Sequence, residues 1–359
     1  MRISFLSWLK RRITKVFKRI KRRFFFDDSK IIYVGRTYKS YWEEYYGNAH
    51  RPFISAIRVK AQARRAFLKE GFRPDEFYLY GLETKSQKDR VYYLSKDKKD
   101  DILISFYGSD WREIFSLLRD KYQFYTCLKD YFKRDVTCIK SAEDRVRFLS
   151  FCGRYRQIFA KVNKGGCGKG ARKITIIDDE QASAVFDDLV SSGEWIIEEV
   201  IDQSQILSSF NSSSINSVRI PSFKRNGNVK CAFPCMRFGR AGCIIDNSTQ
   251  GGLVASIDEQ TGEIVTDAYD EMGNVFLAHP DSKVSFRGFH VPLWDILIDL
   301  VKKAHLALPE NQVYVAFDFA LSEKGWCLVE GNWGDWFLQQ LSLKKGLKEE
   351  FVSLLMGNK

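Results

Sequence analysis

In the second half of the chain, short apolar runs alternate with polar positions, which is the period expected of β-strands. A glycine-rich stretch separates the first two of these runs, and stretches with helical spacing lie between the later ones. The predicted elements are strands at 158–162, 173–177, 194–201 and within 216–267, and helices at 181–189, at 292–308 and at the C-terminus. This order predicts an α/β fold of the α+β kind.

The region before residue 119 gives a mixed pattern and carries no catalytic signal. We expect a helix within residues 41–70, which are rich in Ala and Arg, and another over 111–132. Residues 90–94 and 101–107 are apolar and aromatic, so they are predicted to be strands. We therefore expect residues 27–118 to form a mixed α/β region.

Residues 1–26 have the pattern of a basic amphipathic helix. They contain ten Lys and Arg residues and no Asp or Glu. We expect this helix to bind an anionic membrane surface. Three alternatives remain open: a helix docked on the protein's own body, a basic arm for RNA or DNA, and an organelle transit peptide. The apolar residues at three- and four-residue spacing are Leu6, Leu9, Ile13, Phe17, Ile20 and Phe24.

The formal net charge of +12 is concentrated in this N-terminal segment, which leaves only +2 for the rest of the 359 residues. Because the body is near neutral, we expect no nucleic-acid partner. The eight cysteines are scattered without a Cys-x-x-Cys pair, which favours free thiols in a reducing cytosol. No apolar run approaches the length of a membrane-spanning helix. We expect a cytoplasmic protein held peripherally on the inner face of the membrane.

Two β-rich runs between residues 313 and 332 predict a hairpin that carries acidic side chains. A three-residue turn would pair Ser322 with Trp326, which sets Asp318 opposite Glu330 and places Asn332 on the same face. Like charges that face each other on a sheet repel. Two carboxylates and an amide therefore indicate a Mg²⁺ site. The alternative is a solvated face of an edge hairpin, and a register shift of one residue would remove the pairing.

The glycine-rich stretch at residues 163–170 indicates an anion-binding loop, since glycines let backbone amides approach a phosphate closely. It lies between two predicted strands. A P-loop and a dinucleotide-binding loop both run directly into a helix, so neither motif fits. The arrangement is typical of a flap that covers a phosphate chain, although an ordinary surface turn would have the same composition.

These features together resemble the ATP-grasp fold, over roughly residues 118–345. The sequence is most similar to the sugar-transfer-associated ATP-grasp family, which is found with bacterial surface-polysaccharide genes. The motifs that carry the resemblance are Asp120-Lys121-Tyr122, Ser214-Ile215-Asn216-Ser217-Val218-Arg219-Ile220, Asp246-Asn247 with Gly251-Gly252, His279-Pro280, Pro292-Leu293-Trp294 and Glu330-Gly331-Asn332.

The resemblance implies that ATP binds between a small lobe at residues 119–202, which holds the flap, and a C-terminal lobe at residues 203–359, which holds the metal. Lys121 and Lys161 would contact the α- and β-phosphates. The flap residues expected over the triphosphate are Lys164, Gly165, Gly166, Gly168 and Lys169. The residues expected at the adenine edge are Glu198, Glu199 and Ile201.

The same resemblance implies a metal site and a transfer site. The expected Mg²⁺ ligands are Asp318, Glu330 and Asn332. The catalytic candidates are Arg219 and Arg237, which would face the transferred phosphate, and Asn216. In many ATP-grasp enzymes an acidic residue contacts the ribose where this chain has Gln205.

The activity implied is that of an ATP- and Mg²⁺-dependent ligase. It would activate a carboxylate as an acyl phosphate and join it to an amine in an amide bond, on a substrate that is part of surface-polysaccharide synthesis. Positioning and charge neutralisation suffice for such chemistry, and the chain shows no convincing Ser-His-Asp or Cys-His set. Two alternatives are a phosphotransferase with the same fold and a non-catalytic, membrane-bound assembly partner.

Overall fold

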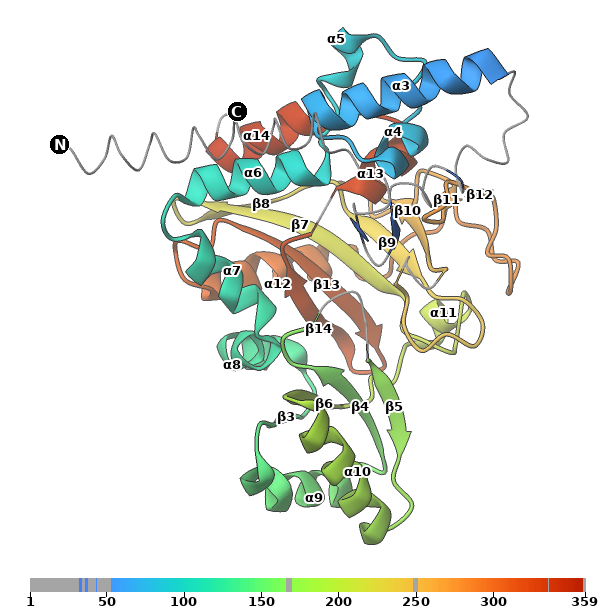
Figure 1. Cartoon of the computed structure of the whole chain (residues 1–359). Helices are drawn as coiled ribbons and strands as arrows, with labels where there is room; N and C mark the ends of the chain where they lie inside the picture. Colours follow the sequence, from blue (N-terminus) through green and yellow to red (C-terminus); the bar gives the residue numbers. More distant parts are fainter. Residues whose placement is uncertain are drawn as a thin grey trace, which may run out of the picture. The chain divides into compact units, whose positions relative to one another are not determined.

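The computed structural model of the chain describes residues 32–33, 36–37, 43, 53–165, 170–247, 251–334 and 336–357. The chain divides into two compact units, residues 1–102 and residues 103–359, whereas the sequence placed a boundary after residue 118 (Figure 1). The amphipathic helix predicted for residues 1–26 lies outside the described residues. No helix among the described residues is long and apolar enough to cross a membrane.

Helices make up most of the described part of the first unit. A short pair of antiparallel strands precedes them, and the last helix continues into the second unit. The elements are β1 (Ile32–Tyr33), β2 (Arg36–Thr37), α3 (Phe53–Glu70), α4 (Pro74–Leu79), α5 (Gln87–Arg90) and α6 (Lys96–Tyr107).

The strands predicted at residues 90–94 and 101–107 are wrong. The first stretch follows the end of α5, and the second lies within α6. Ser95 Oγ accepts a hydrogen bond of 3.2 Å from Lys98 N in the first turn of α6, which stabilises the start of a helix. Buried Leu103 and Tyr107 are four residues apart, the spacing of one helix face. A capping residue and helical spacing therefore outweigh a β-like composition.

The second unit is built on an eight-stranded antiparallel sheet. Its strand order is β12-β11-β10-β9-β7-β13-β14, and β8 pairs with β7. The strands are β7 (Ser217–Arg225), β8 (Asn228–Cys231), β9 (Cys235–Phe238), β10 (Leu253–Ser256), β11 (Ala268–Tyr269), β12 (Val275–Phe276), β13 (Tyr314–Ser322) and β14 (Gly325–Asn332). Strand β13 is buried along almost its whole length because both of its faces are covered.

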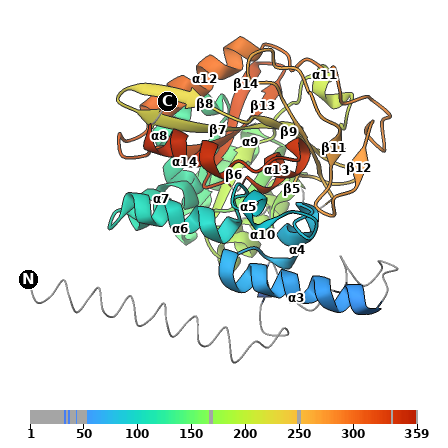
Figure 2. The same ribbon diagram turned by 90° about the horizontal axis from the view of Figure 1, so that it is seen from above.

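Helices cover both faces of this sheet, so the side chains of β13 pack in two directions. Phe317 packs on one side against Phe124 and His305, while Tyr314 packs on the other against Phe351. Seen from above, α12 and α14 lie on opposite sides of the sheet (Figure 2). The covering helices are α7 (Trp111–Arg119), α8 (Lys121–Phe132), α12 (Trp294–Ala307), α13 (Phe337–Leu343) and α14 (Lys348–Met356), and the short α11 (Gln205–Ser208) follows the small sheet.

A separate four-stranded sheet, in the order β3-β6-β4-β5, forms the small lobe of the second unit. Two helices pack on one of its faces, and the hairpin of β13 and β14 lies on the other side (Figure 1). The strands and helix predicted for residues 158–201 are confirmed. The elements are β3 (Val136–Ile139), η1 (Ala142–Asp144), α9 (Arg145–Arg154), β4 (Gln157–Val162), β5 (Arg172–Thr175), α10 (Asp179–Ser192) and β6 (Trp195–Glu199).

The hairpin of β13 and β14 has a shorter turn than predicted, yet it sets Asp318 opposite Glu330 as expected. Ser322 pairs with Gly325 rather than with Trp326, so the turn holds two residues instead of three. A β-bulge at Val329 then inserts one extra residue into β14, because Leu328 pairs with Phe319 while Glu330 pairs with Asp318. The bulge restores the register that the shorter turn had shifted.

Candidate nucleotide and metal site

Asp318 lies on β13, between β7 and β14 in the large sheet, and is held by two arginines. Arg219 faces it directly from β7 and donates from Nε to Oδ1 and from Nη2 to Oδ2, both at 2.7 Å. Arg237 on β9 donates from Nη1 to Oδ2 at 2.8 Å. Burial alone would raise the pKa of Asp318, but the two guanidinium groups lower it below its usual value. The two arginines therefore favour the ionised form of Asp318.

Glu330 lies opposite Asp318 and has the reverse electrostatic balance. Burial raises its pKa, and the negative charge of Asp318 raises it further, while Lys161 and Lys121 offset only part of the effect. Asn332 belongs to the same group, since its Nδ2 lies 3.4 Å from Asp318 Oδ2 and its Oδ1 accepts a hydrogen bond from Gly334 N. A cation between the two carboxylates would remove their repulsion.

The donor set of this group fits Mg²⁺, which prefers oxygen ligands and retains ligands from water or phosphate. Asp318 and Glu330 bring two carboxylates, and Asn332 brings an amide whose Nδ2 faces Asp318 and whose Oδ1 accepts from Gly334 N. Within the described ranges, no three His, Cys, Asp or Glu side chains gather into a metal site made by the protein alone. A metal held here would take its remaining ligands from phosphate oxygens or water.

Arg237 extends the charged group toward the Asp246-Asn247 motif. Its Nη2 lies 3.2 Å from Asp246 Oδ1, and the other oxygen of Asp246 accepts hydrogen bonds from the backbone N–H and the hydroxyl of Ser217. A side chain at Gly252 would place its Cβ 2.5 Å from the backbone oxygen of Asp246. The glycine in this motif therefore allows the loop to pass close behind Asp246.

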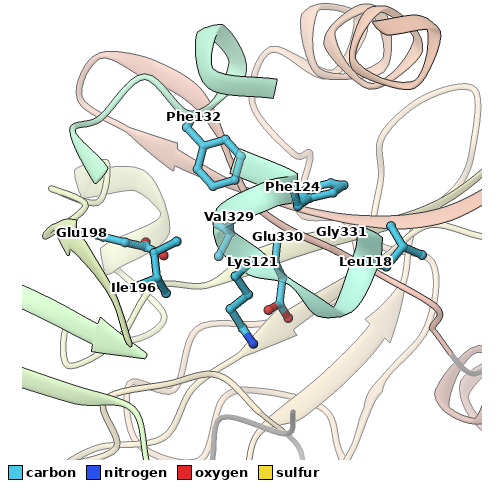
Figure 3. A pocket seen from close by; sticks show the side chains of 9 residues that line it. All are labelled: Leu118, Lys121, Phe124, Phe132, Ile196, Glu198, Val329, Glu330 and Gly331. Carbon is cyan, nitrogen blue, oxygen red and sulfur yellow. The ribbon is translucent and has the colours of Figure 1, made fainter. Parts of the chain in front are cut away.

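A pocket lies between α8, β6 and β14, and Glu330 lines it together with Glu198 (Figure 3). Glu198 is 3% exposed and is paired twice: with Arg134, at 3.0 Å to Nε and 2.7 Å to Nη2, and with Lys161 Nζ at 3.0 Å. Burial would raise the pKa of Glu198, but these two cations lower it. The pocket residues are Leu118, Lys121, Phe124, Phe132, Ile196, Glu198, Val329, Glu330 and Gly331.

Lys121 reaches the base of the glycine loop from the first turn of α8. Its Nζ donates to the backbone oxygens of Val162, Asn163 and Gly165 at 3.2, 3.3 and 2.7 Å. Burial lowers the pKa of Lys121. Lys164 forms longer ion pairs with Asp120 and Glu194. The other predicted flap residues, Gly166, Gly168 and Lys169, lie outside the described residues.

Three other predicted residues have different surroundings. Glu199 follows Glu198 on β6, so its side chain points to the opposite face of the sheet. Its carboxylate accepts from Asp135 N at 3.2 Å and pairs with Lys324 Nζ at 3.3 Å. Ile201 is half-buried. Asn216 is fully buried, and its amide bonds to the backbone of Leu207, Asn211 and Gly239 and to the Gln203 side chain. The structure thus gathers the metal and lysine candidates but places Asn216 within a loop network.

His279 in the His-Pro motif is buried within the same loop region. Its Nε2 lies 2.8 Å from the backbone oxygen of Gly239, and its Nδ1 accepts from the backbone N–H groups of Asp281 and Ser282. Since Nδ1 accepts, Nε2 carries the proton, and burial lowers the pKa of the ring. The neutral His279 therefore fixes the 239 and 281 loops to each other.

Sequence reasoning missed Arg134 and Asn163. Arg134 lies in a run of charged residues after α8 that carries no motif, yet it also donates to the backbone oxygen of Leu328 at 2.5 Å. One feature of the pocket did have a sequence signal, the glycine at position 331. A glycine inside a strand often marks a close approach of another group. A side chain there would overlap the ring of Phe124.

Comparison with known proteins identifies a family for most of the second unit. A model of the sugar-transfer associated ATP-grasp family matches residues 108–353. No curated protein matches the sequence.

Among solved structures, the chain is similar to D-alanyl-alanine synthetase A from Vibrio cholerae O1 biovar eltor (13% identity, TM-score 0.42, covering 68% of this chain and 66% of that one). It is also similar to the VanG D-Ala:D-Ser ligase from Enterococcus faecalis (12% identity, TM-score 0.43, 67% and 62%). A third is N5-carboxyaminoimidazole synthetase from Staphylococcus aureus (12% identity, TM-score 0.35, 60% and 44%). The chain spans less than two thirds of the length of each.

Proposed function

The chain belongs to the sugar-transfer associated ATP-grasp family, and we propose that it is an ATP- and Mg²⁺-dependent ligase. It would convert a carboxylate into an acyl phosphate and join it to an amine. The observation that carries the proposal is the Asp318–Glu330 pair. The two carboxylates face each other, and only Asp318 forms ion pairs with arginine side chains in the part of the chain that the structure describes. This arrangement suits a divalent cation that arrives with a nucleotide.

The residues of this chain would position and neutralise the reactants. Asp318, Glu330 and Asn332 would hold Mg²⁺, which when bound withdraws charge from the phosphate oxygens. Lys121 lines the pocket together with Glu330, Lys161 pairs with Glu198 of the same pocket, and both lysines would neutralise the phosphates. No covalent nucleophile is needed for this chemistry, because positioning and electrostatic stabilisation supply most of the acceleration in phosphoryl transfer.

Arg219 and Arg237 would act on the transferred phosphoryl group. Both guanidinium groups are anchored on Asp318, so their orientation is fixed before substrate binds. Preorganised cations stabilise developing negative charge more effectively than mobile ones. An acyl phosphate formed next to Asp318 would therefore lie within reach of two fixed positive groups.

The substrates are proposed from the family description, which associates these proteins with sugar transfer. A carboxylate or amine on a sugar, or an amino acid joined to one, is the substrate class we favour, in surface-polysaccharide synthesis. Residues 1–26 would hold the enzyme on the anionic inner face of the cytoplasmic membrane. Deletion of residues 1–26 should abolish sedimentation with anionic vesicles but leave turnover in solution unchanged, and loss of turnover would mean that the segment belongs to the catalytic fold.

The proposal is tested by measuring ADP release over a panel of uronic acids, amino acids and amines, with mass spectrometry of the product. A ligase should release ADP and inorganic phosphate together, only when both a carboxylate and an amine are present. A phosphorylated product without free phosphate would identify a phosphotransferase. Failure to bind Mg²⁺–ATP at all would identify a non-catalytic assembly partner.

A further inference from the structure

The beginning of α8 is bonded to the end of β4, where the glycine loop starts. Lys121 N donates to the backbone oxygen of Asn163 at 3.4 Å, and Tyr122 N donates to Asn163 Oδ1 at 2.9 Å. Gln123 N donates to Oδ1 of the capping residue Asp120 at 3.0 Å. The first amides of α8 are therefore satisfied by protein groups, so this helix end is a docking point for the loop and is not a phosphate site.

Asn163 is the centre of this connection. It is 1% exposed, and its Nδ2 donates to Asp120 Oδ1 at 3.1 Å and to Glu194 Oε2 at 3.2 Å. Its backbone N–H donates to the oxygen of Glu194 at 2.9 Å. An asparagine amide supplies both an acceptor for Tyr122 and a donor for two carboxylates. An aspartate would lack the donor.

The same connection fixes Lys121. The three backbone oxygens that hold its Nζ belong to Val162, Asn163 and Gly165, the residues at and beside Asn163. Figure 3 shows the Lys121 ammonium beside the Glu330 carboxylate in the pocket. The position of the loop base and the position of this lysine therefore depend on one buried amide.

We propose that Asn163 is a positioning residue for nucleotide binding. The cluster of Asp120, Asn163 and Glu194, here called the loop clasp, sets the base of the glycine loop at residues 163–165 and Lys121 in one arrangement before nucleotide arrives. Preorganisation of this kind improves affinity because fewer groups are ordered on binding. The part that concerns nucleotide affinity rests on the proposed function, while the docking of the loop base does not.

The direct test is Asn163→Asp, which keeps the acceptor for Tyr122 N but places a third carboxylate between Asp120 and Glu194. We expect the dissociation constant for ATP to rise about tenfold or more, because the loop base and Lys121 would then have to be ordered when ATP binds. Hydrogen exchange of the amides at 120–123 and 163–165 should accelerate in the nucleotide-free protein. Asn163→Ala removes the amide without adding charge and gives a milder version of the same test.

A reciprocal exchange separates positioning from a general loss of stability. In the double variant Asp120→Asn with Asn163→Asp, a donor again faces an acceptor, and the amide oxygen introduced at position 120 can still cap Gln123 N. We expect this variant to recover much of the ATP affinity and slow exchange that Asn163→Asp loses. The matched control is Gln312→Glu, which alters another buried amide, one that donates to Tyr314 O at 3.0 Å. It should lower stability without changing ATP affinity.

Three outcomes would overturn the proposal. Unchanged exchange at 163–165 in Asn163→Asp would mean that the loop clasp does not position the loop. Faster exchange with unchanged ATP affinity would mean that the loop base lies outside the nucleotide site. An equal loss of affinity in Gln312→Glu would mean that any destabilisation has this effect. If the wild-type chain binds no Mg²⁺–ATP, the proposed function and the affinity claim fail together, and exchange alone still decides whether the clasp docks the loop.

Discussion

Glu198 and Glu330 line the same pocket but have opposite electrostatic surroundings (Figure 3). Glu198 is bonded to Arg134 and Lys161, and these cations lower its pKa in spite of burial. Burial and Asp318 raise the pKa of Glu330, and in the part of the chain that the structure describes no cation forms an ion pair with it. A buried carboxylate with matched cations holds the two sheets together, whereas one without them is ready to take up a cation.

The difference also separates two roles for the arginines near the pocket. Arg134 bonds to Glu198 and to the backbone of β14, so it connects the small sheet to the hairpin. Arg219 and Arg237 bond to Asp318 at the metal group. Arg134 therefore serves the structure, whereas Arg219 and Arg237 serve, on the proposed function, the transferred phosphate.

The largest expected difference between the two glutamates is in turnover. Glu330→Gln should lower ATP turnover roughly a hundredfold or more, because it removes a charged metal ligand from a site whose chemistry is electrostatic. Asp318→Asn should have a similar effect. Both variants should still unfold cooperatively in circular dichroism. Full turnover in either one would remove the basis for a metal site at the hairpin.

The next largest difference is in the free energy of unfolding, and here the Glu198 variant should be affected more than the Glu330 variant. Glu198→Gln leaves Arg134 and Lys161 without their buried partner, which should lower the free energy of unfolding by about 3 kcal/mol. Glu330→Gln removes a disfavoured charge and should leave the free energy of unfolding unchanged or raise it by about 1 kcal/mol. Urea unfolding of the two variants at neutral pH measures both. Equal destabilisation would contradict the contrast between the two glutamates.

Lys161 pairs with Glu198 and also lowers the pKa of Glu330 by its charge, so its removal should affect binding. Lys161→Ala should weaken ATP affinity about tenfold, since a hydrogen bond to a charged group contributes about 1.5–3 kcal/mol. Lys303→Ala is the control, because Lys303 forms only an exposed ion pair with Asp299 on α12. Calorimetry should show weaker ATP binding for the first variant alone. Equal dissociation constants for Lys161→Ala and wild type would exclude Lys161 from the nucleotide site.

The smallest expected effect is on the pH dependence of stability. The pKa of Glu330 is raised in the folded state, so its contribution is fully present below the unfolded pKa and is lost as pH rises through the folded pKa. The stability of Glu330→Gln relative to wild type should therefore increase as the pH rises from about pH 4, near the unfolded pKa, to neutral pH. Unfolding curves at both ends of this range measure it. A relative stability that falls with rising pH would contradict the assigned shift.

The hairpin shows how far the sequence could predict the site. The pairing of Asp318 with Glu330 was predicted from two β-rich runs and a glycine, and it is confirmed. The turn length and the bulge at Val329 were not predicted, because an apolar residue in a bulge looks the same in sequence as one in a regular strand. The correct pairing resulted from two deviations that cancel.

Other parts of the site depend on contacts that no local pattern records. Arg134 lies 64 positions from Glu198, and Asn163 lies 41 positions from Tyr122. Residues 101–107 have the composition of a strand, but Ser95 begins a helix and Leu103 and Tyr107 share one of its faces. Local rules predicted the elements from β4 to β6, the helix α12 and the final hairpin, but not β3 or α9, while the partners of buried charges required the fold.

The carboxylate pair is tested most directly by calorimetric titration of Mg²⁺ into the protein saturated with a non-hydrolysable ATP analogue. The wild-type protein should bind Mg²⁺ under these conditions, and Glu330→Gln should bind it at least about tenfold more weakly. Glu198→Gln, measured under conditions in which it is folded, should bind Mg²⁺ with an affinity closer to that of wild type than Glu330→Gln does. Equal Mg²⁺ affinity in wild type and Glu330→Gln would contradict a metal site between Asp318 and Glu330.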